Sequence, residues 1–320
     1  MDNKLLVLYY DNGIKQIFHK CFIESGIQCR SWLKNNAAFA AFSLMTIVKK
    51  IRKFCGNSLY YYPENYDGLI ILFDTKLSEI YLRTIRQKNP EARIILWYWN
   101  EIQHQRLLKF AASLQIDTWS YSPADCKKYD LLYNSQFFFD SAAERYRSLR
   151  DQQKMQGKKS FIFIGREKGR AEQIRMISEE IQKCGWACET EFRASYMSDR
   201  PKDKRLKYKI WCHYDEYLEN VLEYSGILDV AYQPNSGLSL RTLESIFFHK
   251  KLITTNPLVK DCDFYDENNI YVWGHSDMSL SEFLSRPYRP VPDSICQPYL
   301  ISSWASRFFA YYESEAGISQ

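Results

Sequence analysis

Two short segments of the sequence combine glycine, hydroxyl and charged side chains in a way that suits phosphates and sugars. The first is FIFIGREKGR (161–170), in which an apolar run ends at Gly165 and is followed by Arg166, Lys168 and Arg170. Glycine allows a close approach to the backbone, and a helix that begins after such a turn offers amides and a favourable dipole to an anion. The segment predicts a diphosphate-binding turn, although it lacks GxGxxG and a basic surface turn would explain it equally well.

The second segment, QPNSGLSLRTLE (233–244), follows an apolar run that contains Asp229. Its Pro, Asn, Ser and Gly residues predict a turn, and Ser239 is well placed to cap the helix that follows. Backbone amides at 236–240 could donate to phosphate oxygens, and Glu244 could accept hydrogen bonds from two ribose hydroxyls. Complementing the helix dipole is an equally good role for Glu244.

Both segments follow strands of the same predicted half of the chain. Apolar runs alternate with helical patterns along the sequence, which indicates parallel strands covered by helices. We expect strands at 4–10, 68–74, 92–100, 116–122, 128–134, 160–165, 188–193, 227–233 and 251–256. Ligands of doubly wound sheets bind outside the carboxyl ends of the strands, where both segments fall.

The polar segment 145–159 interrupts this rhythm and is the best candidate for an interdomain linker. The 320 residues suit two domains of about 150 residues each. We therefore expect an α/β fold of two Rossmann-like domains, at 1–150 and 151–320, that face each other across a cleft. The aromatic segment 298–314 is predicted to form a C-terminal helix that packs across the domain junction.

Composition narrows the class of protein. With 24 Tyr, 19 Phe and 8 Trp the chain is too rich in aromatic residues to be disordered. The nine Cys show no Cys-x-x-Cys spacing, and together with the five His they offer no zinc pattern. We find no secretory leader and no apolar run of about 18 residues, so we expect reduced thiols in a cytoplasmic protein.

Charge is divided unevenly along the chain. Residues 1–150 carry 21 Lys and Arg against 14 Asp and Glu, a net charge of +7, whereas residues 151–320 carry 22 against 24, a net charge of −2. A basic first half suits an anionic partner or the cytoplasmic face of the inner membrane, and the predicted helix 37–54 ends in the basic sequence KKIRKF. Scattered solvated lysines and a packed helix with a solvated end are the alternatives.

The segments together resemble a known family. The stretch from FIFIGREKGR to KLITTN (161–256) looks like the nucleotide-binding half of bacterial GT-B glycosyltransferases, most similar to those of lipopolysaccharide-core and capsule biosynthesis. Three segments of the first half of the chain resemble the acceptor half of the same group, namely GLIILFD, ARIILWYWN and YSPADCKKYDLLYN. GLSLRTLE is moderately specific, and the remaining similarity is one of pattern.

The resemblance implies transfer of a sugar from a nucleotide donor to a lipopolysaccharide-core or capsular glycan, without a metal and with no cofactor besides the donor substrate. Many retaining members carry a second acid eight residues before the acid that holds the ribose, and Ser236 stands at that position here. The expected donor-binding residues are Gly165, Arg166, Lys168, Ser236, Gly237, Leu238, Ser239, Arg241 and Glu244.

An inverting transferase also needs a general base at the acceptor hydroxyl. Asp11, at the end of the first predicted strand, is the leading candidate, and Asp74 and Glu101 are its rivals. Each of these acids could instead cap a helix. Asn12 and Asn100, at strand ends, are the expected acceptor-binding residues.

Two other classes of function fit the same pattern. A GT-B-fold nucleotide-sugar epimerase would need more His and acidic residues around the donor. A non-catalytic nucleotide-sugar-binding protein would explain Ser236 in place of the second acid. A nucleic-acid partner is poorly supported, because the basic residues form no sustained patch with interleaved aromatics.

Overall fold

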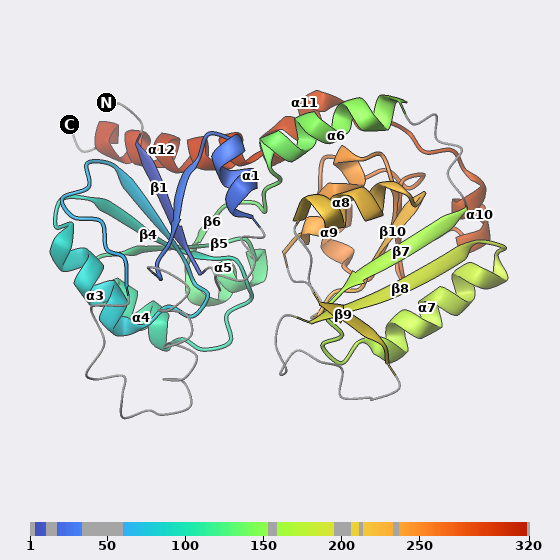
Figure 1. The fold of residues 1–320 in the computed structure, drawn as a ribbon, viewed down its shortest axis with the longest axis horizontal. Coiled ribbons are helices and arrows are strands. Elements are labelled where there is room, and N and C mark those ends of the chain that lie inside the picture. Colours follow the sequence, from blue (N-terminus) through green and yellow to red (C-terminus); the bar gives the residue numbers. More distant parts are fainter. Residues whose placement is uncertain are drawn as a thin grey trace. The chain divides into compact units, whose positions relative to one another are not determined.

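A computed structural model describes residues 4–10, 18–33, 60–152, 159–194, 206–210, 214–232 and 237–318. Its contacts divide the chain into two compact units (Figure 1). Unit 1 consists of Met1–Ser135 and Ala305–Gln320, and unit 2 consists of Gln136–Trp304. Each unit is built around its own parallel sheet.

The unit 1 sheet has the strand order β2-β1-β3-β4-β5-β6. Every neighbouring pair is parallel. This order changes direction between β1 and β3, which is the topological switch point of the flavodoxin-like arrangement. The strands are β1 (Leu5–Tyr9), β2 (Gln28–Ser31), β3 (Leu69–Phe73), β4 (Arg93–Tyr98), β5 (Asp117–Ser120) and β6 (Leu132–Tyr133).

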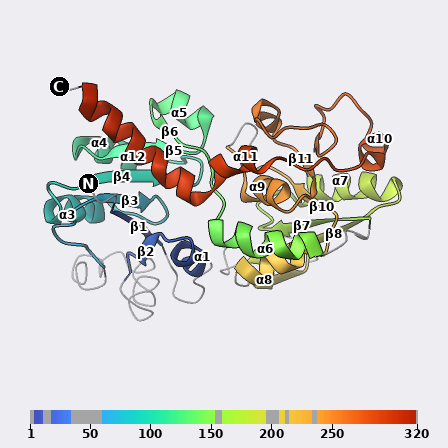
Figure 2. The same cartoon turned by 90° about the horizontal axis from the view of Figure 1, so that it is seen from above.

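Helices cover both faces of the unit 1 sheet, which explains why its strands are apolar on both sides. The core on one face joins the even-numbered side chains of β1, β3 and β4 to α3 (Glu79–Lys88) and α4 (Arg106–Ser113). On the other face Phe22 of α1 (His19–Glu24) packs on Phe73, and Phe308 of α12 (Ile301–Ile318) packs on Trp97 and Trp119. Figure 2 shows α12 passing over this sheet. The short helix α5 (Pro123–Tyr129) precedes β6.

The unit 2 sheet has the order β12-β11-β10-β7-β8-β9, with every pair parallel. Numbered within the unit this is 3-2-1-4-5-6, the order of dinucleotide-binding Rossmann folds, and it reverses between β7 and β10. The strands are β7 (Ser160–Gly165), β8 (Ala187–Ala194), β9 (Tyr208–Ile210), β10 (Gly226–Asp229), β11 (Lys251–Thr254) and β12 (Ile270–Val272).

Helices also lie on both faces of the unit 2 sheet. Figure 1 shows α7 on one face and α8 and α9 on the other. The helices are α6 (Asp140–Gln152), α7 (Ala171–Lys183), α8 (Tyr214–Leu222), α9 (Leu240–Phe247), α10 (Leu280–Ser285) and α11 (Asp293–Cys296).

The structure confirms the predicted α/β class with two Rossmann-like units and a long C-terminal helix. The contacts separate the units after Ser135, whereas the sequence reading separated them after residue 150. The difference arises at α6, because Tyr146 packs on Phe248 and donates to the carbonyl of Asp215 at 3.1 Å, both within unit 2. The predicted linker therefore begins as a packed helix. The C-terminal helix α12 begins in unit 2 and continues into unit 1.

Other differences concern single elements. The first two residues of the strand predicted at 128–134 belong to α5, so that strand shortens to β6. The strands β2, β9 and β12 were not predicted. The predicted helix 37–54 lies outside the described residues.

Gly226 should be essential to the packing of the unit 2 sheet. A Cβ added there would lie 2.2 Å from the ring of Phe161, which is fully buried on the neighbouring strand. We expect Gly226→Ala to lower the free energy of unfolding by about 1–3 kcal/mol through overpacking. Urea denaturation measures this. The double variant Gly226→Ala/Phe161→Leu should recover part of the loss, and purely additive losses would contradict the proposed clash.

Candidate functional site

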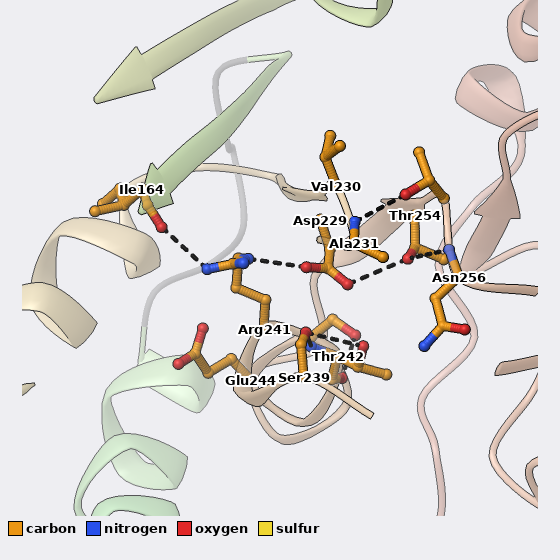
Figure 3. Close-up of polar contacts among 12 residues, drawn as sticks. Ile164, Asp229, Val230, Ala231, Ser239, Arg241, Thr242, Glu244, Thr254 and Asn256 are labelled. Atoms are coloured by element: carbon orange, nitrogen blue, oxygen red, sulfur yellow. Dashed lines mark hydrogen bonds and ion pairs between the residues drawn. The ribbon is translucent and has the colours of Figure 1, made fainter. Parts of the chain in front are cut away.

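The two segments singled out in the sequence meet at the switch point of the unit 2 sheet. β7 and β10 are neighbours in the sheet, with Ile162 paired to Ile227. Arg241, in the first turn of α9, reaches across to β7 and donates through one terminal nitrogen to the carbonyl oxygen of Ile164 at 3.2 Å (Figure 3). The strand order reverses at this point, and such positions are where Rossmann sheets bind ligands.

Arg241 also forms a buried ion pair with Asp229, the last residue of β10. The Nε of Arg241 lies 2.9 Å from Oδ1 of Asp229, and the two side chains are 18% and 2% exposed. The other oxygen of Asp229 accepts from the hydroxyl of Thr254 at 3.2 Å, and that hydroxyl accepts from the amide of Asn256 at 3.1 Å. The pair therefore ties α9 to the carboxyl ends of β7, β10 and β11.

Gly165 has the close-approach role that the sequence suggested, but the group that approaches it is a protein side chain. A Cβ at Gly165 would lie 3.3 Å from a terminal nitrogen of Arg241 and 3.2 Å from the ring of Phe163. Both distances are shorter than ordinary van der Waals contacts. Glycine at this position is what lets the guanidinium of Arg241 lie against the end of β7.

The basic residues after Gly165 divide into two roles. Arg170 is buried and donates to the carbonyl oxygens of Arg166, Glu167 and Val230, so it holds the turn together. Burial, together with the nearby charge of Arg241, lowers the pKa of Arg170 to about 10.

Arg166 is partly exposed and Lys168 is exposed, so these two cations can reach a ligand in solvent. Lys168 has a φ of +48°, and its ammonium lies 5.0 Å above the ring of Tyr232, which follows β10. The predicted phosphate-side turn thus presents two cations at the carboxyl ends of β7 and β10.

The start of α9 is arranged as the sequence predicted. Ser239 caps the helix, and its hydroxyl accepts from the amide of Thr242 at 3.2 Å. Gly237 is fixed by Asn256, whose side-chain nitrogen donates to its carbonyl oxygen at 3.3 Å, and Leu238 is buried. The first amides of a helix have no intrahelical acceptor, so this end of α9 suits an anion.

Glu244, one turn after Arg241 on α9, is only 1% exposed. Its Oε1 accepts from the hydroxyl of Tyr214 at 2.8 Å, and its Oε2 accepts from the hydroxyl of Tyr217 at 2.6 Å. The two tyrosine rings are stacked at the start of α8. Burial raises the pKa of Glu244 to about 7, although these hydroxyls and the charge of Arg241 act in the opposite direction.

Three of the candidate residues, Asp11, Asn12 and Ser236, lie outside the described residues. Asn100 lies in unit 1, just after β4. Sequence reasoning did not assign roles to Tyr214, Tyr217 and Thr254, and it did not pair Asp229 with Arg241. The two tyrosines are three residues apart, and this was a usable signal because that spacing places both on one face of a helix.

The described ranges contain no group of three or more His, Cys, Asp and Glu side chains arranged to hold a metal ion. Within the same ranges, no helix has both the length and the apolar character needed to span a bilayer.

Several solved structures resemble the chain over almost its whole length. T4 phage β-glucosyltransferase in complex with its UDP-glucose substrate matches with a TM-score of 0.43 and 12% identity, over 95% of this chain and 98% of that chain. A structure of the DNA-modifying enzyme β-glucosyltransferase, solved with and without uridine diphosphoglucose, gives a TM-score of 0.43 and 13% identity over the same shares. The T4 phage enzyme with UDP and Mn²⁺ gives a TM-score of 0.41 and 10% identity, again over 95% and 98%. No protein-family model and no curated protein matches the chain. At these low identities and TM-scores the similarity says nothing about the substrates of this chain. Its function has to be inferred from its own residues.

Proposed function

We propose that this chain is a GT-B-type glycosyltransferase whose unit 2 binds a nucleotide-sugar donor. One observation carries the proposal: the turn after β7 and the start of α9 meet at the switch point of a Rossmann-ordered sheet, joined there by Arg241. The two segments lie far apart in sequence, and each is of the kind that binds phosphate oxygens.

The charges at this edge suit the leaving diphosphate of a sugar transfer. As the bond between the anomeric carbon and the diphosphate breaks, negative charge grows on the nucleoside diphosphate, and positioned cations and amides stabilise it. Arg166, Lys168 and the first amides of α9 are the groups that can fill this role. Arg241 carries a further positive charge at the same edge and is 18% exposed.

Glu244 is the proposed ribose-binding acid. Each of its oxygens accepts one tyrosine hydroxyl, and a carboxylate oxygen has a second lone pair that a ribose hydroxyl can use. Because Glu244 is almost fully buried, a ribose reaches it only if a neighbouring side chain moves. Donor affinity in a Glu244 variant therefore tests this part of the proposal.

For the acceptor we keep the glycan that the sequence resemblance suggests, of the lipopolysaccharide-core or capsular type. A cytoplasmic location and a peripheral contact with the inner-membrane surface are parts of the same proposal. Metal-independent transfer, with the donor as substrate and no further cofactor, also stays a prediction.

The test is to incubate the full chain with a panel of nucleotide sugars, including UDP-glucose, and to follow nucleotide release with and without lipopolysaccharide-core or capsular acceptors. Acceptor-dependent release, with and without EDTA, supports metal-independent transfer. Donor binding without turnover would identify a non-catalytic binding protein. Interconversion of the donor sugar without transfer would identify an epimerase, and no donor binding would contradict the proposal.

A further inference from the structure

A second group of polar and aromatic side chains lies at the carboxyl edge of the unit 1 sheet. The strand order of this sheet changes direction between β1 and β3. Asp74 is the first residue after β3, and Trp99 and Asn100 are the first two residues after β4, the next strand of the sheet. These residues therefore lie beside the position where a doubly wound sheet offers a ligand site.

The backbone and its neighbours hold the carboxylate of Asp74 in place. The amide of Asp74 donates to the carbonyl oxygen of Trp97 at 2.9 Å, and the amide of Trp99 donates to Oδ1 of Asp74 at 3.0 Å. The side chain of Asn100 also hydrogen-bonds to the carboxylate. Asp74 as a residue is intermediate in exposure, so its carboxylate has a fixed orientation near the surface of unit 1.

An aromatic surface adjoins this carboxylate. The ring of Trp99 packs edge-on against buried Phe73 with the centroids 4.9 Å apart, and it lies 5.3 Å from the ring of Phe18. Trp99 is partly exposed, whereas Trp97 is fully buried. A rigid aromatic face beside a hydrogen-bond acceptor suits a ring that is apolar on its face and hydroxylated at its edge, as a sugar is.

We propose that Asp74 accepts the proton of the acceptor hydroxyl and that Trp99 is the platform for the acceptor sugar ring. This inference rests on the proposed glycosyltransferase function. The hydroxyl oxygen forms a bond to the anomeric carbon of the donor while its proton passes to Asp74. The bond from that carbon to the diphosphate breaks, and its electron pair leaves with the nucleoside diphosphate.

The surroundings of Asp74 suit a proton acceptor near neutral pH. Burial raises the pKa of Asp74 to about 7, and the hydrogen bonds from the Trp99 amide and the Asn100 side chain offset part of this rise. Among the described residues, Tyr98 interacts electrostatically with Asp74. Burial and the charge of Asp74 raise the pKa of Tyr98, and Asp125 and Tyr129 of α5 act on it in the same direction. A base with a pKa near the working pH is the most effective one.

The test compares Asp74→Asn with Asp67→Asn in the full chain. Asparagine keeps an oxygen for the Trp99 amide but cannot take the proton. Asp67 also lies in unit 1 and has a side chain that is 93% exposed and paired with Lys4, so its variant controls for loss of one negative charge. We measure donor affinity and the rate of nucleotide release from pH 5 to pH 9. Release is followed with water as the only acceptor and with methyl glycosides as probe acceptors.

We expect Asp74→Asn to bind donor normally and to lose about 100-fold in turnover. The turnover rate of the wild type should fall as the pH drops below about 7. The residual activity of Asp74→Asn should not show this fall. Trp99→Ala should raise the KM for methyl glycosides at least tenfold and change release to water much less.

Two outcomes would overturn the inference. If the wild type turns over a donor while Asp74→Asn keeps both its rate and its pH profile, Asp74 is not the base and the proposed function still stands. If the wild type binds no donor, the proposed function fails and the inference fails with it.

Discussion

Replacement of Arg241 by methionine should lower the free energy of unfolding by about 3–5 kcal/mol, because it leaves the buried carboxylate of Asp229 without its partner. Asp229 is only 1% exposed, and the hydroxyl of Thr254 donates to its other carboxylate oxygen. The same change removes the hydrogen bond that ties α9 to the carbonyl oxygen of Ile164. Urea denaturation of the full chain, followed by hydrogen exchange within unit 2, measures the effect.

The double variant Arg241→Met/Asp229→Asn separates structure from binding. Asparagine is uncharged and can still accept from Thr254, so most of the lost stability should return. Donor affinity should not return with it, because a charge-assisted hydrogen bond to the diphosphate contributes about 1.5–3 kcal/mol, which is roughly tenfold or more in Kd. A stable double variant with wild-type donor affinity would show that Arg241 only ties the elements together.

The ion pair between Arg241 and Asp229 also shows what could not be predicted from the sequence. Both segments were recognised, because a glycine after a buried strand and a serine before a helix are local signals. The ion pair joins residues 12 positions apart, on β10 and α9, and the bond to Ile164 spans 77 positions. Only the strand order, which places β10 beside β7, brings these groups together. The patterns that predict single strands do not determine that order.

For the strands, too, local patterns could be recognised in the sequence and pairing could not. Buried runs such as 68–74 and 160–165 were recognised from their apolar character, and they form β3 and β7. The edge strand β9 (Tyr208–Ile210) is fully exposed, and no strand was predicted over its residues. This strand forms because it pairs with β8, and its own sequence contains no apolar pattern that predicts a strand.

The acids were harder to rank than the strands. Asp11 and Asp74 both follow apolar strands, and nothing in the sequence distinguishes a base from a helix cap. The structure shows Asp74 bound by the Trp99 amide of a neighbouring strand end, beside a partly exposed indole. That juxtaposition depends on the pairing of β3 with β4. Asp11 lies outside the described residues, so its role stays a prediction.

Replacement of Glu244 by glutamine should weaken donor binding at least tenfold, about 1.4 kcal/mol. Glutamine fills nearly the same volume, so the packing around Tyr214 and Tyr217 should persist. Its amide nitrogen, however, presents a donor where a ribose hydroxyl needs an acceptor. Titration calorimetry with the best donor from the panel measures the change. Glu216→Gln, at an exposed position of α8, is a matched control, and it should leave donor affinity unchanged.

The same variant should be more stable than the wild type at pH 8, although it binds donor less well. The pKa of Glu244 is about 7 in the folded chain and near 4.5 when unfolded. Between these values the folded chain keeps a proton that the unfolded chain has lost, so wild-type stability falls as the pH rises from 4.5 to 7. The full effect is about 3 kcal/mol at 1.36 kcal/mol per pKa unit. Denaturation of Glu244→Gln should lack this decline.

The two effects of Glu244→Gln therefore have opposite signs, which no general loss of folding can produce. A buried carboxylate that costs stability above pH 7 is expected where its charge serves binding. If ribose hydroxyls bind the ionised form, wild-type donor affinity should fall below pH 7, and the affinity of the glutamine variant should not change with pH over that range. Equal pH dependence of stability in both proteins would contradict the raised pKa. A stabilised variant with unchanged donor affinity would leave Glu244 as an anchor for the two tyrosines and remove it from the donor site.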